Sequence, residues 1–590
     1  MDAERATSDQ AVHIEQRPFT ASALSTWSDS TDRHRNWPVV YTINSDSEVY
    51  VGETVNAQAR MRQHLETPEK GRLKEFRIIL DDTFNKSVCL DLESFLIRMF
   101  SGDGRFKVLN RNDGVTEANY FQRDAYRQQF AQIFEQLRSE GLFDKRIPEI
   151  VNSDLYKLSP FKALNSDQEA VIEDILEGLF ANLYAGREST AVVEGEPGTG
   201  KTIVAIYLLK LIADIRARND ADTGESDTPF SIYFAEGYPE LLVGSRIGLV
   251  VPQQSLRKSV KNVFKRTPGL REDMVLTPYE VAKSDVPYDL LIVDETHRLT
   301  QYAAQSMGTL TAAFREISQR LARDGEDWKE LTQVDWIVRH SRHQVFLLDE
   351  GQGVRPADVP SASLTKLREL ARDAERRYRL RSQMRVAGGE GYLAFARALL
   401  DDLGPARPGM FGGYDLRFFD RADTMYEQIL ARESETGLAR LVAGYGWKWV
   451  SKGKPADASV WDIEIDGLRL CWNRAATDWI NSPTSIHEVG SIHTVQGYDL
   501  NYAGVIVGPE LYLDRTTGRI ALNRSNYFDT KGKAANNLRG LTYSDSEVLA
   551  MVKNVYNVLL TRGVRGTYVY VVDPGLRAHL RRYFAHLVEG

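Results

Sequence analysis

A glycine-rich loop between an apolar strand and an apolar helix constrains this chain most. The strand is centred on Val192 and Val193, and the helix runs over residues 203–212. The loop has the pattern G-x-x-x-x-G-K-T, in which backbone N–H groups and the positive end of the helix bind phosphate oxygens. Its predicted ligand-binding residues are Gly195, Pro197, Gly198, Thr199, Gly200, Lys201 and Thr202. We therefore predict an ATP site, with Lys201 on the β- and γ-phosphates and Thr202 on Mg²⁺.

Two carboxylates follow a second apolar run, residues 290–293. At the end of a buried strand, Asp294 is placed to hold Mg²⁺ through water, and Glu295 is placed to activate the hydrolytic water. His297 follows at a helix start, where it either couples the site to a bound ligand or serves only near the cap. This run supplies the second half of a phosphate-hydrolysing site.

Two glutamines are candidates for contacts with the nucleotide. Gln352 follows the apolar strand 345–349 in the pattern Asp-x-x-Gln and is a candidate sensor of the γ-phosphate. Gln168 lies before the helix that precedes the P-loop strand, and its amide can read both polar edges of adenine; the alternative is an ordinary residue at a helix start. Ligands of open α/β sheets bind at the carboxyl ends of the strands, so we expect these groups along one edge.

From Leu158 onwards strands and helices alternate, which favours an α/β fold with parallel sheets and crossover helices. A second α/β unit contains Arg385, Arg562 and the pair Gln496 and Gly497, without a P-loop of its own. We predict that both arginines act as arginine fingers on the nucleotide of the first unit, and that Gln496 and Gly497 also belong to the nucleotide site. The alternative for each arginine is a surface or ion-paired side chain.

Two basic segments suit the path of a nucleic-acid backbone. Residues 253–266 carry amide, hydroxyl and cationic groups after a buried strand; the alternative is a solvated helix face. Residues 513–543 interleave six Lys or Arg residues with Tyr527 and Phe528, a combination that contacts phosphates and stacks bases, or else forms a mobile surface loop. The net charge of −8 gives no general attraction for nucleic acid, so binding depends on such local patches.

The order of these motifs resembles superfamily 1 helicases. The strings VVPQQSLRKSVKNVFK, VDETHRL, SQMR, SIHTVQGYDLNYAGVIVG and NVYNVLLTRGVRG resemble the helicase-like ATPase domain related to the carboxy-terminal part of Schlafen proteins, over residues 158–590. The resemblance implies two RecA-like lobes, hydrolysis of Mg·ATP, and DNA or RNA as the ligand. It leaves open whether the motor unwinds a duplex, translocates or acts as an ATP-dependent switch. A P-loop kinase is the remaining alternative; it predicts no stimulation by polynucleotide.

The amino-terminal third has the pattern of a small mixed α/β domain. The expected elements are strands 39–43 and 49–52, helix 56–65, strand 76–80, helix 86–100 and strand 106–109. The candidate site residues are Tyr41 and Tyr50 on the hairpin, Arg60 and His64 on the first helix, and Glu93 on the second. Glu93 would hold a divalent ion, Arg60 would neutralise charge on a phosphate, and a tyrosine with His64 would position or deprotonate water.

Residues 37–112 resemble the GIY-YIG endonuclease domain. Val39-Val40-Tyr41 and Tyr50-Val51-Gly52 stand for the two triplets, and the helix from Asn56, Glu93 and Asn110 complete the order. The resemblance implies Mg²⁺- or Mn²⁺-dependent cleavage of DNA or RNA. The first triplet departs from the family because it lacks the glycine. The alternative is a copy that only binds nucleic acid or docks a partner, within an ATP-gated sensor.

Composition and the pattern of polar segments give the remaining expectations for this chain of 590 residues and 66.7 kDa. The predicted parts are a disordered tail (1–36), a GIY-YIG-like domain (37–116), a helical connector (117–157), and RecA-like lobes 1 (158–362) and 2 (363–590). No run is apolar enough for a membrane span, the start is not a secretory signal, and two distant cysteines suit a reducing cytoplasm. Nuclease and motor together suggest antiphage defence or repair, with self-association or defence partners.

Overall fold

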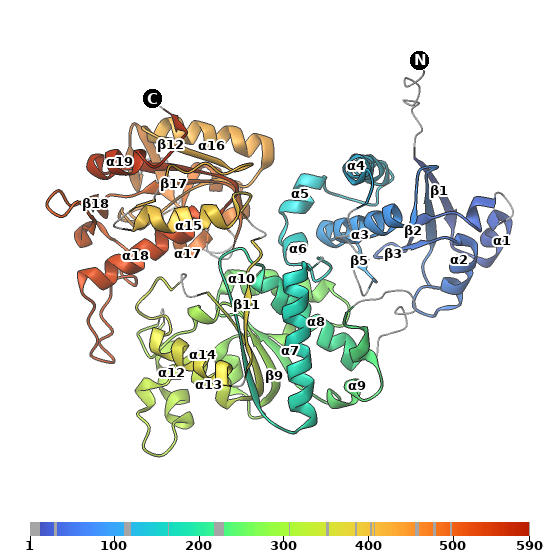
Figure 1. The fold of residues 1–590 in the computed structure, drawn as a ribbon, viewed down its shortest axis with the longest axis horizontal. Coiled ribbons are helices and arrows are strands. Elements are labelled where there is room, and N and C mark those ends of the chain that lie inside the picture. Colours follow the sequence, from blue (N-terminus) through green and yellow to red (C-terminus); the bar gives the residue numbers. More distant parts are fainter. Residues whose placement is uncertain are drawn as a thin grey trace. The chain divides into compact units, whose positions relative to one another are not determined.

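The computed structural model describes residues 12–28, 32–110, 120–162, 164–217, 229–305, 307–349, 353–373, 375–383, 386–401, 404–405, 407–454, 460–475, 479–495 and 498–588 (Figure 1). Its chain divides into two compact units. The first comprises residues 1–165, 206–240 and 259–272, and the second residues 166–205, 241–258 and 273–590. Among the described residues, no helix combines the length and the apolar character that crossing a bilayer requires.

A five-stranded sheet of order β1-β4-β2-β3-β5 forms the centre of the first unit. Its strands are β1 (His13–Pro18), β2 (Val39–Asn44), β3 (Glu48–Thr54), β4 (Glu75–Leu80) and β5 (Lys107–Val108). The helices of this part are α1 (Ala21–Ser28), α2 (Ala57–Glu66), α3 (Lys86–Asp103), α4 (Arg123–Ser139), α5 (Ile147–Asn152) and α6 (Asp154–Lys157). β2 and β3 form the expected hairpin, with Tyr41 opposite Gly52. Asn56 and Asn85 cap α2 and α3 with their side chains, which fixes where both helices begin.

The prediction of a disordered tail over residues 1–36 is wrong for residues 13–28 and 32–36, which are ordered. β1 pairs antiparallel with β4 along its whole length, from His13 opposite Leu80 to Pro18 opposite Glu75. Trp27 of α1 is buried, stacks on His34 at 3.9 Å between ring centroids, and donates from Nε1 to Glu15 at 2.6 Å. β1 is an edge strand stabilised by backbone pairing, and its mostly polar sequence therefore lacks the hydrophobic signal of a strand.

Replacing Trp27 by Ala is expected to lower the free energy of unfolding of the first unit by about 3–5 kcal/mol, because a fully buried aromatic side chain is lost. Phe121 is the matched control, since its side chain is 84% exposed and Phe121→Ala removes little packing. Chemical denaturation followed by circular dichroism measures both. Equal midpoints for parent and Trp27→Ala would contradict this role of the amino-terminal segment.

In the segment predicted as a helical connector, helix α4 packs on the first unit. Phe130, Ile133, Phe134 and Leu137 of α4 are buried in one cluster with apolar residues of α3, as predicted for a helix packed against a neighbour. The exposure of Phe121 is the exception, because this residue precedes the first turn of α4 and does not share its buried face. The helix therefore packs on the core of the first unit and is not a free linker.

The second unit contains two parallel sheets. The first has the order β11-β6-β10-β9-β7-β8, with every pairing parallel. Its strands are β6 (Ser189–Gly195), β7 (Ile247–Val250), β8 (Val275–Leu276), β9 (Tyr288–Val293), β10 (Ser341–Leu348) and β11 (Arg377–Leu380). Helix α7 (Ser166–Tyr184) precedes β6, and α8 (Lys201–Arg216) follows it. This sheet is the core of lobe 1, and β6, the P-loop strand, lies between β10 and β11.

The predicted boundary between residues 362 and 363 is wrong. α14 (Ser361–Asp373) packs Leu364 and Leu367 into the lobe 1 core, and β11 pairs parallel with β6. Lobe 1 therefore extends to Leu380. β11 has the sequence Arg-Tyr-Arg-Leu and lies at the edge of the sheet, and its membership of lobe 1 is established only by its pairing with β6.

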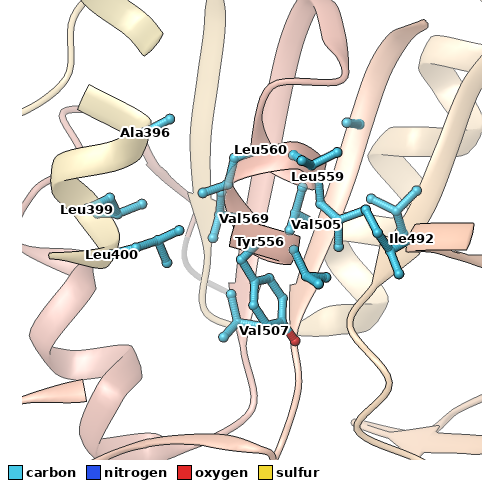
Figure 2. Close-up of a cluster of buried hydrophobic side chains, with 14 of the residues drawn as sticks. Ala396, Leu399, Leu400, Ile492, Val505, Val507, Tyr556, Leu559, Leu560 and Val569 are labelled. Carbon is cyan, nitrogen blue, oxygen red and sulfur yellow. The ribbon is translucent and has the colours of Figure 1, made fainter. Parts of the chain in front are cut away.

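Lobe 2 is an eight-stranded sheet of order β14-β15-β16-β13-β17-β20-β12-β21, parallel except for the β14–β15 pair. Its strands are β12 (Asp415–Phe419), β13 (Ala439–Ala443), β14 (Ile463–Ile465), β15 (Leu468–Trp472), β16 (Glu488–Ser491), β17 (Leu500–Val507), β20 (Gly563–Val571) and β21 (Leu587–Val588). The main helices are α15 (Gly389–Leu400), α16 (Ala422–Thr436), α18 (Asp545–Leu560) and α19 (Pro574–Arg581). Figure 2 shows part of the core, where α15 and α18 pack their apolar side chains against β17 and β20. Both lobes are thus α/β with parallel sheets, as the sequence predicted.

Candidate active sites

The P-loop joins β6 to α8, which begins at Lys201. Gly198 (φ 90°) and Gly200 (φ 81°) adopt left-handed backbone conformations that favour glycine. At Gly195, a Cβ atom would lie 2.4 Å from Oγ1 of Thr199. The loop therefore uses its glycines for backbone conformation and close approach, which is what a phosphate-binding loop needs.

Lys201 is buried, and its ammonium group lies inside the loop. Nζ donates to the carbonyl oxygens of Gly195 (2.6 Å) and Glu196 (2.9 Å) and to Oδ2 of Asp349 (3.2 Å). Asp349 follows β10, so the loop and the neighbouring strand meet at the lysine. The cation is thereby placed at the carboxyl edge of the sheet, where the sequence predicted the phosphates to bind.

Thr202 and Asp294 meet at the same edge. Oγ1 of Thr202 donates to Oδ2 of Asp294 at 2.7 Å, although the two residues are 92 positions apart. Burial and the adjacent Glu295 raise the pKa of Asp294. These two oxygens are hard ligands of the kind that Mg²⁺ prefers, and their contact fits the predicted ion.

Glu295 has a left-handed backbone (φ 50°), which is uncommon for a residue other than glycine. Its Oε2 lies 2.9 Å from Nε2 of His297, and the main-chain N–H of Asp349 donates to Nδ1 of His297 at 3.4 Å. Although burial opposes ionisation, His297 and Lys201 hold the pKa of Glu295 below its usual range. His297 thus contacts Glu295 and the end of β10, and its coupling role remains a prediction.

Two glutamines donate hydrogen bonds to the P-loop, and only one of them was predicted from the sequence. Nε2 of Gln168, the predicted adenine reader, donates to the carbonyl of Thr199 at 2.9 Å. Nε2 of Gln383 donates to the carbonyl of Pro197 at 2.6 Å. Gln383 was not predicted, although it lies in the string SQMR, which carried the family resemblance through Arg385.

Arg562 is buried inside lobe 2. Its guanidinium donates to the carbonyls of Val558 and Tyr498, both at 3.2 Å. Its role as an arginine finger remains a prediction. Four further predicted site residues lie outside the described part of the chain, namely Gln352, Arg385, Gln496 and Gly497.

A groove of about 840 Å³ lies within the second unit and is lined by both lobes. Lobe 1 contributes Gln253, Gln254, Ser255 and Arg257 from the predicted basic segment, together with Thr277, Tyr279, Arg298, Gln333 and Arg355. Lobe 2 contributes Trp479, His493, Thr494 and Lys531. The lining combines amides, hydroxyls, guanidinium groups and an aromatic ring, which suits a phosphate backbone with unpaired bases.

The 513–543 insertion is bonded to both lobes. Asp529 accepts from Nε2 of His493 at 2.8 Å, and Nδ2 of Asn536 donates to the carbonyl of Tyr302 in lobe 1 at 2.8 Å. Arg539 pairs with Glu330, whereas Lys533 and Arg524 bond to carbonyls within the insertion. Several of its cations are therefore engaged by the protein, and Lys531 is the cation from this insertion that lines the groove.

In the first unit, three predicted residues form one cluster. Oη of Tyr41 lies 2.8 Å from Nε2 of His64 and accepts from Nε of Arg60 at 3.4 Å. Burial, Lys70 and Arg60 lower the pKa of His64 to about 2, so its imidazole is neutral at physiological pH. A Cβ atom at Gly52 would lie 2.2 Å from Oη of Tyr41, so the glycine of the second triplet makes room for the tyrosine of the first.

Two of the other residues of the resemblance have defined surroundings. Tyr50 packs beside Tyr41 at 6.2 Å between ring centroids, and Nζ of Lys70 lies 3.7 Å from its ring centroid. Asn110 accepts from the N–H of Val51 (3.0 Å) and donates to its carbonyl (2.7 Å), so it holds β3 to the segment after β5. Lys70 is a cation at this site that the sequence did not single out.

Glu93 lies on the side of α3 that contacts β3. Burial and the neighbouring carboxylate of Glu53 raise its pKa to about 8. Glu53 is itself buried: its Oε1 pairs with Nζ of Lys86, and its Oε2 has no hydrogen-bond partner among the described residues. Within that part of the chain no group of three or more His, Cys, Asp or Glu side chains is arranged to hold a metal. A metal here would therefore depend on one or two carboxylates, which is common for Mg²⁺.

The second unit has the organisation of a helicase-like ATPase: two parallel-sheet α/β lobes, a P-loop in one of them, and a polar groove lined by both. A family model, "Schlafen group 3, DNA/RNA helicase domain", matches residues 188–573. The chain belongs to this family. That match covers the P-loop, the acidic pair and lobe 2 up to the residue before α19, and it leaves the first unit's sheet outside.

Individual relatives are more distant. The chain is 26% identical over 469 residues to "Uncharacterized protein YPL245W" of Saccharomyces cerevisiae, covering 74% of this chain and 94% of the yeast protein. Among solved structures, the arterivirus nonstructural protein 10 helicase matches with a TM-score of 0.27 and 13% identity, over 68% of this chain and 64% of that one. A Bacteroides Pif1 helicase, solved with ADP-AlF3 and ssDNA, matches with a TM-score of 0.24 and 10% identity, over 70% of this chain and 94% of that one. Such low TM-scores establish no shared arrangement of the lobes, so the family match carries the assignment.

Proposed function

We propose that this chain is an ATP-driven motor that acts on DNA or RNA, fused to an amino-terminal GIY-YIG-type, metal-dependent endonuclease. For the motor, the observation that carries the proposal is the 2.7 Å contact between Thr202 and Asp294 beside the buried Lys201. Bound Mg·ATP would supply the phosphate to be transferred and the ion that neutralises its charge. Lys201 would hold the β- and γ-phosphates, Thr202 and Asp294 the ion, and Glu295 would orient the attacking water.

The nuclease half is supported by the cluster of Tyr41, Arg60 and His64 and by the nearby half-buried Glu93. A neutral His64 beside the Tyr41 hydroxyl would orient this tyrosine toward the water that attacks a phosphodiester, although its lowered pKa makes His64 itself a weak base. Arg60 would stabilise negative charge on the phosphate, and Glu93 would hold Mg²⁺ or Mn²⁺. In this proposal the motor positions nucleic acid for cutting, an architecture that suits restriction of foreign nucleic acid or repair.

The test measures ATP hydrolysis and strand cleavage by the full chain with single- and double-stranded DNA and RNA, in Mg²⁺ and in Mn²⁺. We expect polynucleotide to stimulate ATP turnover and cleavage to require the metal. Turnover that no polynucleotide changes would refute the motor. Absence of cleavage on every substrate would refute the nuclease.

A second candidate, an ATP-gated sensor with a non-cleaving first domain, is favoured by one observation. Lys86 already pairs with Glu53 next to Glu93, and its ammonium group lowers the need for a metal at these carboxylates. In that case the first domain would bind nucleic acid or a partner without hydrolysing it. Metal-dependent cleavage that disappears in Glu93→Gln would exclude this candidate.

Coupling between nucleic acid and hydrolysis is supported by contacts that lead from the groove to the acidic pair. Arg298 lines the groove, is 4% exposed, and pairs with Asp358 at 3.2 Å. It lies in a single helical turn (Thr296–Arg298) that starts directly after Glu295. Asp358 also binds Arg355, a second guanidinium of the groove, at 2.8 Å. A nucleic-acid phosphate that binds Arg298 would therefore shift the helical turn that begins directly after Glu295.

Arg298→Gln is expected to leave basal ATP hydrolysis near the parent value. The stimulation of hydrolysis by polynucleotide should fall about tenfold, which is a typical size for the coupling between two sites. Arg342→Gln is the control, because Arg342 is exposed near the amino end of β10, away from the carboxyl edge. Phosphate release at increasing polynucleotide concentration separates the two effects. Unchanged stimulation in Arg298→Gln would refute this coupling role.

A further inference from the structure

Glu53 is a buried acidic residue of the first unit, and its two carboxylate oxygens differ in their surroundings. It follows Gly52 on β3 and is 9% exposed. One carboxylate oxygen, Oε1, pairs with the ammonium group of Lys86. The other, Oε2, is buried and has no hydrogen-bond partner among the described residues. Burying a carboxylate oxygen without a donor or cation is unfavourable, so this oxygen indicates a missing positive ligand.

Glu93 brings a second carboxylate to the same place. The main-chain N–H of Glu53 donates to the Glu93 carboxylate, so the two acidic residues are direct neighbours across the contact between β3 and α3. On α3, Lys86, Cys89 and Glu93 are spaced by three and four residues and share one helix face. Lys86 is therefore the cation that pairs with Glu53 and also acts on Glu93, whose carboxylate feels the charge of Arg60 as well.

The donor set is that of a hard divalent ion. Carboxylate oxygens suit Mg²⁺ and Mn²⁺, and Mg²⁺ is commonly bound through one or two carboxylates while water and substrate phosphate fill the other positions. Cys89 lies beside both acidic residues, and burial, together with Glu53, raises the pKa of its thiol. The carboxylates are therefore the groups that supply hard oxygen ligands here.

We propose that Glu53 and Glu93 together form the divalent-cation site of the first unit and that Lys86 competes with the ion for Glu53. The inference rests on the proposed nuclease function and adds two residues to it. Entry of the ion displaces the Lys86 ammonium group from Glu53 and provides the buried Oε2 with a positive partner. When the metal is absent, the Lys86 ammonium group offsets the repulsion between the two carboxylates and so keeps them together.

The experiment is a calorimetric Mn²⁺ titration of the full chain carrying Asp294→Asn, which removes the motor's ion ligand. In this background the variants are Glu53→Gln, Glu93→Gln and Lys86→Met. The control is Asp46→Asn, because Asp46 is an exposed carboxylate of the same domain that is ion-paired with Lys74. We expect both glutamine variants to weaken Mn²⁺ binding by about tenfold or more, since the loss of a ligand removes a charge-assisted contact. Lys86→Met should bind Mn²⁺ more tightly than the parent, and the control should bind equally.

The outcomes separate this inference from the function on which it rests. Full Mn²⁺ affinity in Glu53→Gln together with loss in Glu93→Gln overturns the role of Glu53 and leaves the nuclease proposal standing. No Mn²⁺ binding by the parent overturns both. Lys86→Met retains both carboxylates and therefore tests the competition even if Glu53→Gln folds poorly; affinity equal to or weaker than the parent's overturns it.

Discussion

Replacing Lys201 by Ala is expected to reduce polynucleotide-stimulated ATP hydrolysis by a factor of about 10³ or more, the size of effect that follows removal of one preorganised charge from a transition state. The ammonium group is already fixed by two loop carbonyls and Asp349, so little reorganisation is needed when phosphates bind. Steady-state phosphate release at saturating polynucleotide measures the change.

The control for Lys201 is Lys366→Ala, an exposed lysine on α14 in the same lobe. Lys201→Ala also leaves Asp349 buried without its cation, which destabilises the lobe. Thr202→Ala avoids this problem, because it removes only the hydroxyl that bonds Asp294, and it should also abolish most turnover. Nearly full turnover in both variants would contradict the nucleotide site.

Replacing Glu93 by Gln is expected to reduce metal-dependent cleavage by a factor of about 10³ or more, because the ion that stabilises the leaving oxygen loses its carboxylate. Product formation from a labelled oligonucleotide in Mn²⁺ measures the loss. Glu66→Gln is the matched control, since Glu66 is exposed at the end of α2. Cleavage that persists in Glu93→Gln would place the chemistry elsewhere.

The same variant has a consequence for stability that does not depend on activity. The pKa of Glu93 is 4.5 in an exposed chain and about 8 in the folded domain without metal. Between these values the folded state binds more protons than the unfolded state, so the contribution of Glu93 to stability falls as the pH rises from 4.5 to about 8. Denaturation midpoints of the first unit measured across this range should show the decline in the parent and a smaller one in Glu93→Gln.

The contacts of the nucleotide site could be predicted where its residues lie in continuous motifs next to strands or helices. The P-loop, the apolar run before Asp294 and the strand before Asp349 each predicted a strand with a polar end. Parallel pairing then places these ends together, which is why the contact between Thr202 and Asp294 could be anticipated across 92 residues. The hairpin with Tyr41 and the helix with Arg60 and His64 were anticipated in the same way.

Prediction from the sequence failed where pairing or packing alone determines the structure. β1 is a polar edge strand without the hydrophobic period that predicts a strand, and the pairing that assigns β11 to lobe 1 is not visible in the sequence of residues 377–380. Glu53 and Lys86 are ordinary surface-type residues in the sequence, and their importance appears only when α3 packs on β3. The Arg298–Asp358 pair likewise joins residues 60 positions apart that no motif connects.

The contacts of Asn536 and Arg539 with lobe 1 restrict how this motor can move. Both residues belong to an insertion of lobe 2, and they bond to Tyr302 and Glu330 of lobe 1. Any hinge motion that widens the groove must break these bonds or pivot about them. The insertion therefore links the two lobes at a fixed distance, and in the proposed motor it would limit how far the lobes can separate during each cycle of ATP hydrolysis.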